Sequence, residues 1–562
     1  MPETPPVVSQ ISIKLDGTNV DHELLSSLAS GEVDQHAYLP GMFTLSFYDT
    51  DLELLDRGPF DLTKKITIAM ENEAGTAFTL IDGEITGLEP VFREGMIAEL
   101  VVRGYDKSHR LFRQTKSKAF LNKKDSDLAS EIAQSAGLTA EVEATSIVYE
   151  HIFQDNQSDM NFLTQRAWRI GYECFVADGK LYFRKPPVNQ SGITLTWGRD
   201  LLSFHQRLTL AEQVNEVVVR GWDAQKKDAI VGRAQSGKLY PNIRERQDGA
   251  SWAQSFGTGK VIIVDQPVIN QAEADLLAAA RLNELSGAFI EADGEAFRRP
   301  DIKAGRFVDL AGLGNRFSGK YLVTSATHTY TARGLSTTFK VCGARAGLLS
   351  EQIGGRVPLE RWPGAVTAIV TNTEDPKNWG RVKVKFPWLT DSAESNWARL
   401  IGPGGGKKAG LLAIPEVGDE VIVVFEHGDF NRPIVLGGIW NGKDAIPPKT
   451  DGASSNEKPL VRTWCSRKGH RITMYDNQDN KIEVITANGN QIILDDANKK
   501  ISIVSSGGLK INLDDNGRKV TFESGGEVEI KSTGNMKIQS GGMLDIQANG
   551  MVNIKGATVN LN

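Results

Sequence analysis

A glycine-rich run, RLIGPGGGKKAG at 399–410, is the first stretch whose residue types could do chemistry. Backbone N–H groups of such a loop cradle phosphates when the spacing is G-x-x-x-x-G-K-[ST]. Here Ile401 stands where that pattern requires a glycine, and Lys408 stands where it requires serine or threonine. We therefore predict an exposed loop of a barrel and no phosphate site.

Acidic clusters are the second candidate for chemistry. The aspartate pairs at 495–496 and 514–515 suggest the two carboxylates of glycosidic cleavage. However, neighbours on a strand point to opposite faces, and both pairs fall where a hairpin turn is expected. A third cluster lies in EHGDFNRP (426–433), which fits a turn between two strands. We predict no catalytic residue, no cofactor and no metal in these clusters, so the chain is not expected to be an enzyme.

Composition narrows the class of protein. The 562 residues suggest three or four domains, and the net charge of -6 without a basic block argues against nucleic acid as a partner. The three cysteines, Cys174, Cys342 and Cys465, lie far apart, which argues against a disulfide framework or a zinc site. The start, MPETPPVVSQ, lacks the features of a signal peptide, and no run of about 18 apolar residues occurs. We expect the chain to be cytoplasmic when it is synthesised and assembled.

Most of the chain alternates apolar and polar residues with a period of two, which predicts a mainly β, multidomain protein. Helical periodicity is confined to 125–137, 158–171 and 270–287, where Asn270 and Glu273 resemble a capping box. The runs VVRGYD (101–106) and VVRGWD (218–223) suggest an internal repeat, although echoes this short also arise by chance.

Residues 469–562 form a repeat array. Units of 18 to 19 residues, such as QIILDDANKKISIVSSGG, read as strand, polar turn, strand and glycine pair, and they give way to blocks of eight from Val528 to Val559. Places one and three of each block point to the same face of a strand, and we predict that they form a core: Val528, Ile530, Met536, Ile538, Leu544, Ile546, Val552 and Ile554. Glycine at place seven allows a turn with positive φ, and we predict turns at Gly526, Gly534, Gly542 and Gly550.

A single chain is too short to wind this array into a stable closed prism. Wound alone, a triangular prism would use three blocks per turn, and the chain would complete fewer than two turns, whereas a solenoid needs roughly three repeats. If three chains each supply one face, every block becomes a closed layer and no sheet edge stays open. We therefore predict a homotrimer with an intermolecular triple-stranded β-helix. A monomeric β-solenoid is the alternative.

Residues 361–445 form a separate small barrel, followed by a polar linker at 446–468. The runs GAVTAIV, DPKNWGRVKVKFPW and PEVGDEVIVVFEHGDFNRPIVLGGIWNG resemble the OB-fold of Vgr-family and phage-baseplate spike proteins. The units IILDDANKKISIVSSGG are similar to the β-helix of that family, and FQDNQSDMNFLTQRAWRIGYECFVADGKLYFRK (153–185) is similar to a segment of its hub.

The resemblance implies the hub and membrane-piercing spike of a contractile injection system, either a phage-tail-like particle or type VI secretion. It implies a tube-like β-barrel at 1–115, an α/β insertion at 116–190, a second tube-like β-barrel at 191–350, the OB-fold and the β-helix. Three chains would then present six barrels to a hexameric inner tube protein, alongside baseplate proteins. Effector cargo is a further implied partner, and the target membrane is pierced only on firing.

The end of the array is expected to bind a cap. Relatives carry a conical PAAR-type protein there, and we predict binding at Val559, Asn560, Leu561 and Asn562. Because no histidine follows His470, a metal at the tip would have to come from that partner. A trimeric tailspike that binds or depolymerises carbohydrate is the alternative function, and it would show aromatic or acidic clusters along the helix.

Overall fold

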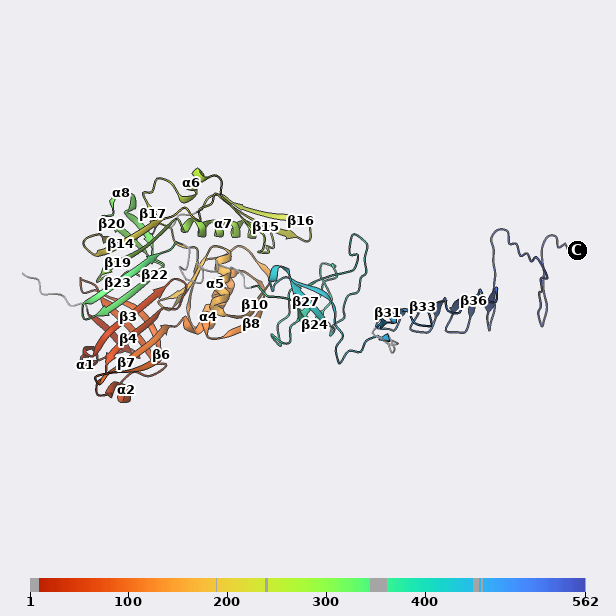
Figure 1. Ribbon diagram of the computed structural model, residues 1–562, viewed down its shortest axis with the longest axis horizontal. Helices are drawn as coiled ribbons and strands as arrows, with labels where there is room; N and C mark the ends of the chain where they lie inside the picture. Colours follow the sequence, from red (N-terminus) through yellow and green to blue (C-terminus); the bar gives the residue numbers. More distant parts are fainter. Residues whose placement is uncertain are drawn as a thin grey trace, which may run out of the picture. The chain divides into compact units, whose positions relative to one another are not determined.

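The computed structural model describes residues 10–188, 190–237, 241–343, 361–447, 454–455 and 458–560. The chain divides into two compact units, Met1–Ile439 and Trp440–Asn562, each of which is described by itself. Figure 1 shows their strands and helices in sequence colours. Among the described residues, no helix has both the length and the apolar character needed to cross a membrane.

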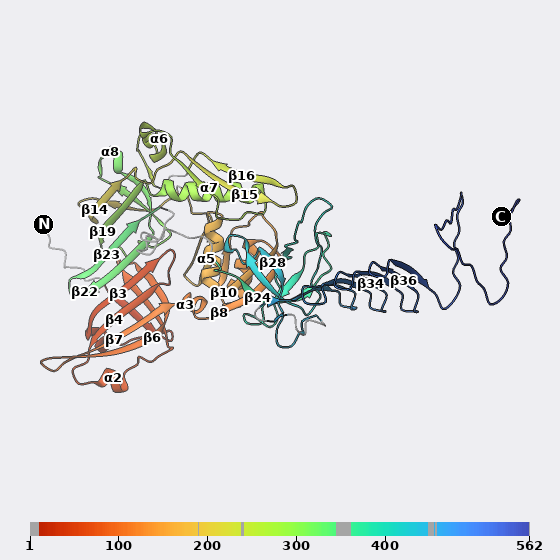
Figure 2. The same cartoon turned by 45° about the vertical axis from the view of Figure 1, so that its right-hand side comes forward.

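The first unit is built on one 11-stranded antiparallel sheet, much of which is visible in Figure 2. Strands β22 and β3 pair from Ser325↔His36 to Tyr330↔Gly31 and so join the two segments in which separate barrels were expected. The order across the sheet is β14 (Leu201–Leu208), β19 (Ile290–Phe297), β23 (Gly334–Val341), β22 (Ser325–Thr331), β3 (Leu28–His36), β4 (Met42–Tyr48), β7 (Ile97–Asp106), β6 (Ala77–Arg93), β5 (Lys65–Glu71), β1 (Ile11–Leu15) and β2 (Thr18–Asn19).

Alternation decides which face of this sheet is buried. In strand β4, Phe43, Leu45 and Phe47 are at most 1% exposed, while the intervening Thr44 and Ser46 stay half-buried on the other face. The predicted mainly β class is confirmed. The short helices of the unit are α1 (His22–Ser26), α2 (Glu53–Arg57), α3 (His109–Phe112), α6 (Gly249–Ala253) and α8 (Gly314–Phe317), with a 3₁₀ turn at Gln254–Phe256.

An α/β segment with its own hydrophobic core follows the first strands of the sheet. Helices α4 (Asp125–Ser135) and α5 (Asp159–Arg169) confirm two of the helix predictions, and the Ser158 side chain caps α5 by accepting from the Asn161 N–H. The strands of this segment are β8 (Thr115–Lys123), β9 (Thr139–Val142), β10 (Tyr149–Ser158), β11 (Glu173–Ala177) and β12 (Lys180–Arg184).

The segment expected to be one second barrel, 191–350, supplies β14, β19, β22 and β23 to the large sheet and contains two further substructures over its described residues. Strands β13 (Ile193–Thr196), β20 (Phe307–Ala311), β21 (Gly319–Leu322) and β17 (Asn242–Ile243) form one sheet. Strands β16 (Asp228–Ala234), β15 (Glu216–Asp223) and β18 (Lys260–Ile263) form another, which packs against the predicted helix α7 (Gln271–Gly287). VVRGYD lies in the large sheet and VVRGWD in this smaller one, so the suggested repeat does not mark equivalent strands.

Residues 366–438 form a five-stranded sheet in the order β25-β24-β27-β28-β26. Val421, Val423 and Phe425 of β27 face a buried core, and the alternate residues Ile422 and Val424 are half-buried. The strands are β24 (Val366–Asn372), β25 (Lys383–Lys385), β26 (Arg399–Leu400), β27 (Glu420–Phe425) and β28 (Pro433–Gly438).

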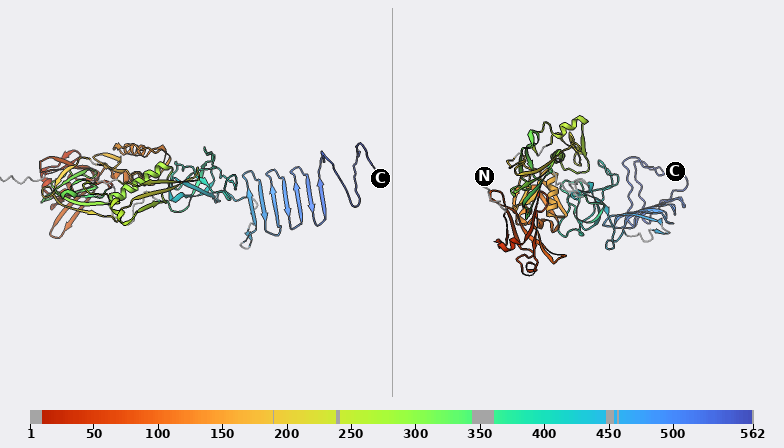
Figure 3. Two further views of the ribbon diagram at one scale, coloured as in Figure 1. Left: turned by 90° about the horizontal axis from the view of Figure 1, so that it is seen from above. Right: turned by 60° about the vertical axis from the view of Figure 1, so that its left-hand side comes forward.

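The second unit carries a seven-stranded antiparallel meander, which Figure 3 shows as a ladder of arrows. Its first strand falls within 446–468, so the predicted linker is too long and the array begins before residue 469. The strands are β31 (Val461–Cys465), β32 (Arg471–Tyr475), β33 (Lys481–Ile485), β34 (Gln491–Asp495), β35 (Lys500–Val504), β36 (Lys510–Asp514) and β37 (Lys519–Glu523), preceded by a short hairpin of β29 (Ser454–Ser455) and β30 (Lys458–Pro459).

Candidate functional site

Strands β32 to β37 of the meander share one apolar face, which we call the apolar spike face. From β32 to β37, cross-strand partners such as Ile482↔Leu494 and Val484↔Ile492 place apolar residues opposite each other, whereas Arg462 of β31 lies opposite Met474. Apart from Ile511, which is half-buried, the residues of this face are 38–69% exposed. The face consists of Ile472, Met474, Ile482, Val484, Ile492, Leu494, Ile501, Ile503, Ile511, Leu513, Val520 and Phe522.

The opposite face of the meander mixes polar and charged residues with a few apolar ones, such as Ile485, Ile493 and Val504. Cross-strand pairing places Lys481, Asp495, Lys500, Asp514 and Lys519 in one column. Lys500 Nζ lies 3.5 Å from Asp514 Oδ2. Exposed pairs of this kind contribute little to stability.

The octads after β37 make no backbone–backbone hydrogen bonds within the chain over the described residues 525–560. The chain bends at 525–526, 533–534, 541–542 and 549–550, the places predicted for turns. The predicted core residues are exposed in the single chain, by 49–73%: Val528, Ile530, Met536, Ile538, Leu544, Ile546, Val552 and Ile554. A single chain thus leaves both the backbone and the apolar side chains of this segment without partners.

The predicted reason for glycine at these bends is wrong. None of Gly526, Gly534, Gly542 and Gly550 has a positive φ. Instead, the first three bends are held by a serine two residues earlier, whose Oγ accepts the glycine N–H at 3.1–3.3 Å. The serines are Ser524, Ser532 and Ser540, and the fourth bend has Ala548 at the same place.

The acidic pairs lie in the hairpin turns of the meander. Asp495 Oδ1 accepts the Asn498 N–H at 2.9 Å, and Asp514 Oδ1 accepts the Gly517 N–H at 3.0 Å. Hydrogen bonds from the Asn498 side chain and backbone lower the pKa of Asp495, and that of the Gly517 N–H lowers the pKa of Asp514. Both carboxylates therefore close turns.

The first unit contains a junction at which the α/β segment completes the core of the OB domain. Phe153 of β10 is 2% exposed, and its ring centroid lies 4.9 Å from that of Phe430. Its N–H donates to Asn431 Oδ1 at 2.7 Å, and a ring nitrogen of His151 lies 2.9 Å from the Glu394 carbonyl oxygen. The OB domain therefore lacks part of its own core without β10.

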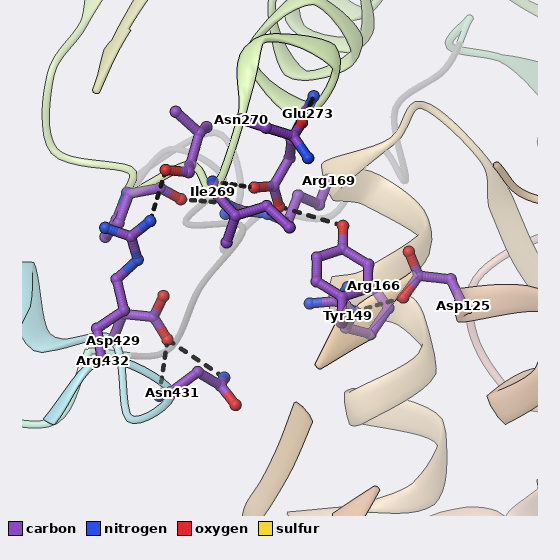
Figure 4. Close-up of polar contacts among 12 residues, drawn as sticks. Asp125, Tyr149, Arg166, Arg169, Ile269, Asn270, Glu273, Asp429, Asn431 and Arg432 are labelled. Atoms are coloured by element: carbon purple, nitrogen blue, oxygen red, sulfur yellow. Dashed lines mark hydrogen bonds and ion pairs between the residues drawn. The ribbon is translucent and has the colours of Figure 1, made fainter. Parts of the chain in front are cut away.

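Buried ion pairs surround this junction, as Figure 4 shows. Arg169 Nε donates to Glu273 Oε1 at 2.8 Å, and the Tyr149 hydroxyl donates to the same oxygen at 3.1 Å. Arg166 Nε donates to Asp125 Oδ1 at 2.6 Å. These contacts tie helices α4, α5 and α7 together beside a cavity of about 250 Å³.

Electrostatics keep the members of this cluster in complementary protonation states. Burial by itself favours the neutral acid, but Arg169 holds the pKa of Glu273 below its usual value. Burial raises the pKa of Tyr149, which therefore stays a hydrogen-bond donor. Arg432, in the turn after β27, donates to the Val268 carbonyl oxygen and so links the OB domain to the segment before α7.

The junction is a feature that the sequence patterns do not predict. They assign Asp429 and its neighbours to a turn, and the structure does place a 3₁₀ turn at Glu426–Gly428 between β27 and β28. Just after this turn, Asn431 accepts the Phe153 N–H and Arg432 donates to the Val268 carbonyl oxygen. The pattern assigns Glu273 to a capping box, yet its carboxylate accepts from Ile269 N–H at 2.6 Å and from Arg169. Among the described residues, no group of three or more His, Cys, Asp or Glu could hold a metal.

Two family models match the chain. The Alg8 N-terminal domain matches residues 49–332, just over half of the chain, and the type VI secretion system/phage-baseplate injector OB domain matches residues 366–440. The second match coincides with the five-stranded sheet of β24–β28.

Curated relatives match shorter segments. The chain is 37% identical over 148 residues to the type VI secretion system spike protein VgrG1c of Pseudomonas aeruginosa, a match that covers 24% of this chain and 20% of that protein. It is 40% identical over 74 residues to VgrG3 of Vibrio cholerae, covering 12% of this chain and 7% of that protein. The chain thus spans about a fifth or less of the length of these relatives.

Solved structures give weaker likenesses. The Escherichia coli c3393 protein, a component of the type VI secretion system, has a TM-score of 0.49 and 15% identity, covering 76% of this chain and 99% of that one. A chain of the Francisella PdpA–VgrG complex has a TM-score of 0.48 and 10% identity, covering 92% of this chain and 80% of that one. On the two family models and the curated relatives, the chain belongs to the Alg8 N-terminal domain family over 49–332 and is a Vgr-family baseplate protein.

Proposed function

We propose that this chain is the structural hub and membrane-piercing spike of a contractile injection system, a phage-tail-like particle or type VI secretion, and that it works as a homotrimer. The observation that carries the proposal is the apolar spike face. A sheet face that is apolar over six consecutive strands needs a second surface to cover it.

Copies of the same chain are the covering surface that the sequence favours. Three octads meeting at one level would bury six apolar side chains per layer, at about 1.5–3 kcal/mol each, or of order 10 kcal/mol before the chain entropy is subtracted. They would also pair the free backbone groups of the octads and leave no open edge. The polar column of lysines and aspartates then faces water.

The hub would adapt this trimer to a hexameric inner tube and to the baseplate proteins. Support comes from the 11-stranded sheet, which runs through both segments expected to carry a tube-like barrel. Among the described residues its outermost strands, β14 and β2, have no further strand beside them apart from the single Trp197↔Leu201 bridge, so copies can continue the sheet into a ring. Six similar barrels from three chains would match a six-fold partner.

The junction between hub and OB domain suits the transmission of thrust. Phe153 and the Arg432–Val268 contact join the OB domain to the segments around helices α4, α5 and α7, which buried ion pairs tie together. Removing one partner from a buried pair costs about 3–5 kcal/mol. A push on the hub therefore reaches the OB domain through packed side chains, and the spike follows it in the chain.

The remaining partners belong to the same proposal. A PAAR-type protein is expected at Val559, which is 46% exposed, and Asn560; the predicted tip residues Leu561 and Asn562 lie outside the described residues. Effector cargo, and membrane contact on firing, follow from the role of a spike. Synthesis and assembly are placed in the cytoplasm, with release in the particle, and the role requires no enzymatic step.

The proposal is tested by substituting adjacent residues on opposite faces of strand β35. Ile503→Asp would place three carboxylates in a dry core, which is strongly unfavourable, whereas Ser502→Asp adds the same charge to the polar face. Native mass spectrometry should show trimers for the wild type and for Ser502→Asp, and mainly monomers for Ile503→Asp. Trimers of unchanged thermal stability in Ile503→Asp would contradict the proposal.

A further inference from the structure

The glycine-rich run of the OB domain forms an ordered loop, and the proposed function assigns it no role. It occupies 401–419 between strands β26 and β27. Its own backbone closes it: the Gly406 N–H donates to the Ala409 carbonyl at 3.0 Å, and the Leu411 N–H donates to the Pro403 carbonyl at 2.9 Å. Internal hydrogen bonds of this kind hold one conformation without help from the barrel.

Two glycines allow the arms of this loop to cross. A Cβ on Gly410 would lie 2.8 Å from the Cα of Gly405, a distance that real side chains do not adopt. Gly410 also has a φ of +117°, which other residues rarely adopt. The glycines therefore serve the shape of the loop, which accounts for their number without a phosphate ligand.

The loop presents large apolar side chains to solvent. Leu412 is 78% exposed, and Ile401, Leu411, Ile414 and Val417 are 36–62% exposed. Leu412 and Ile414 reach over Gly380, where an added Cβ would lie 3.8 Å from Leu412 and 3.7 Å from Ile414. Five such residues in the 17 positions of a fixed loop favour an interaction surface, because isolated proteins rarely expose large contiguous apolar patches.

We propose that this loop packs against the OB domain of a second copy of the chain. The inference rests on the proposed function, since a trimeric spike brings three OB domains together. In each copy the segment 439–460 connects the OB domain to the first spike strand, so three OB domains are tethered around one axis. Three copies of a preformed apolar loop, held at high effective concentration, will bury one another's surface.

The loop also exposes two lysines, Lys407 and Lys408, so an anionic membrane is a second possible binding partner that the test must distinguish. Apolar residues beside lysines also occur on loops that insert into anionic membranes. A homotypic contact is favoured here because the tether supplies the second copy in every assembly, whereas a membrane meets the spike only on firing.

Photo-crosslinking in the full-length chain tests the contact. Leu412→p-benzoyl-phenylalanine replaces an exposed side chain, so folding should be preserved. Met96→p-benzoyl-phenylalanine is the matched control, since Met96 is 89% exposed in the turn between β6 and β7 of the hub. Irradiation should give several-fold more crosslinked dimer and trimer bands at 412 than at 96, with crosslinked peptides from 361–438 of the second copy.

The outcomes separate this inference from the proposed function. A trimeric mass without interchain crosslinks at 412 overturns the loop contact and leaves the trimer standing. A monomeric mass overturns the trimer itself. Crosslinks from 412 that appear only with phosphatidylserine-containing vesicles, as adducts to lipid, would assign the loop to membranes and also overturn the proposal.

Discussion

His328 shows at the scale of one residue how the hub depends on pH. It is 0% exposed in strand β22, and its Nδ1 lies 3.0 Å from Thr337 Oγ1. Burial lowers the pKa of His328 to about 4, with Lys303 opposing and Asp301 favouring the charged form more weakly. The imidazole is therefore neutral in the folded hub at neutral pH.

The sign of the pH dependence follows from this depressed pKa. Between about pH 6.5 and 4 the unfolded chain binds a proton that the folded hub does not, so stability falls as the pH falls, by about 3 kcal/mol in all. Below about pH 4 this contribution levels off. The wild type should lose more stability than His328→Gln between pH 7 and pH 4.5, measured by urea unfolding. Equal losses in both proteins would show that His328 does not titrate in this way.

Residue-level predictions from sequence succeeded where a local rule decides the outcome. Asparagine at 270, predicted as part of a capping box, caps helix α7 because its side-chain oxygen accepts the N–H three residues on. The prediction of positive φ at the octad glycines was wrong because glycine permits a positive φ without requiring it. At three of the bends a serine hydrogen bond forms the turn instead.

At the scale of elements, strand β10 belongs to two domains at once. Phe153→Ala should leave a cavity in the OB core and cost about 3–5 kcal/mol, although the substitution lies more than 200 residues from β27 and β28. We expect faster amide exchange in 420–438, measured by hydrogen–deuterium exchange. Leu121→Ala is the control, because Leu121 pairs with His151 on the neighbouring strand but is 55% exposed. Equal exchange in the two variants would mean that the OB domain does not depend on β10.

Helices and hairpins with a strong hydrophobic period could be predicted from the sequence. The elements that they contact in the folded chain could not. Helices α4, α5 and α7 and the hairpins at DDANKK and DDNGRK follow from spacing and turn residues alone. The pairing of β22 with β3, and the contact of Arg432 with Val268, join residues more than 150 positions apart. No local pattern carries that information, so the junction and the split of 191–350 became visible only in the structure.

At the scale of the whole molecule, disrupting one layer of the spike should destabilise the whole trimer. Ile546→Asp puts a carboxylate at 65% exposure in a single chain, where it costs little, but buries three of them in a trimer. The variant should lose the trimer or melt at a clearly lower temperature, measured by size-exclusion light scattering and thermal unfolding. Lys537→Asp is the matched control, because its side chain lies on the opposite face of a neighbouring octad and should leave assembly unchanged. A trimer unaffected by Ile546→Asp would remove this residue from the core.

The central claim is that the octads are built between copies, and amide exchange over 528–555 tests it most directly. Within one chain these described residues have no backbone partners, so any protection must come from other copies. Hydrogen–deuterium exchange on the intact assembly should show slow exchange throughout this segment, in a particle whose native mass is three times the 61.4 kDa of one chain. Exchange at the rate of an unstructured peptide, in a particle of any mass, would contradict the account.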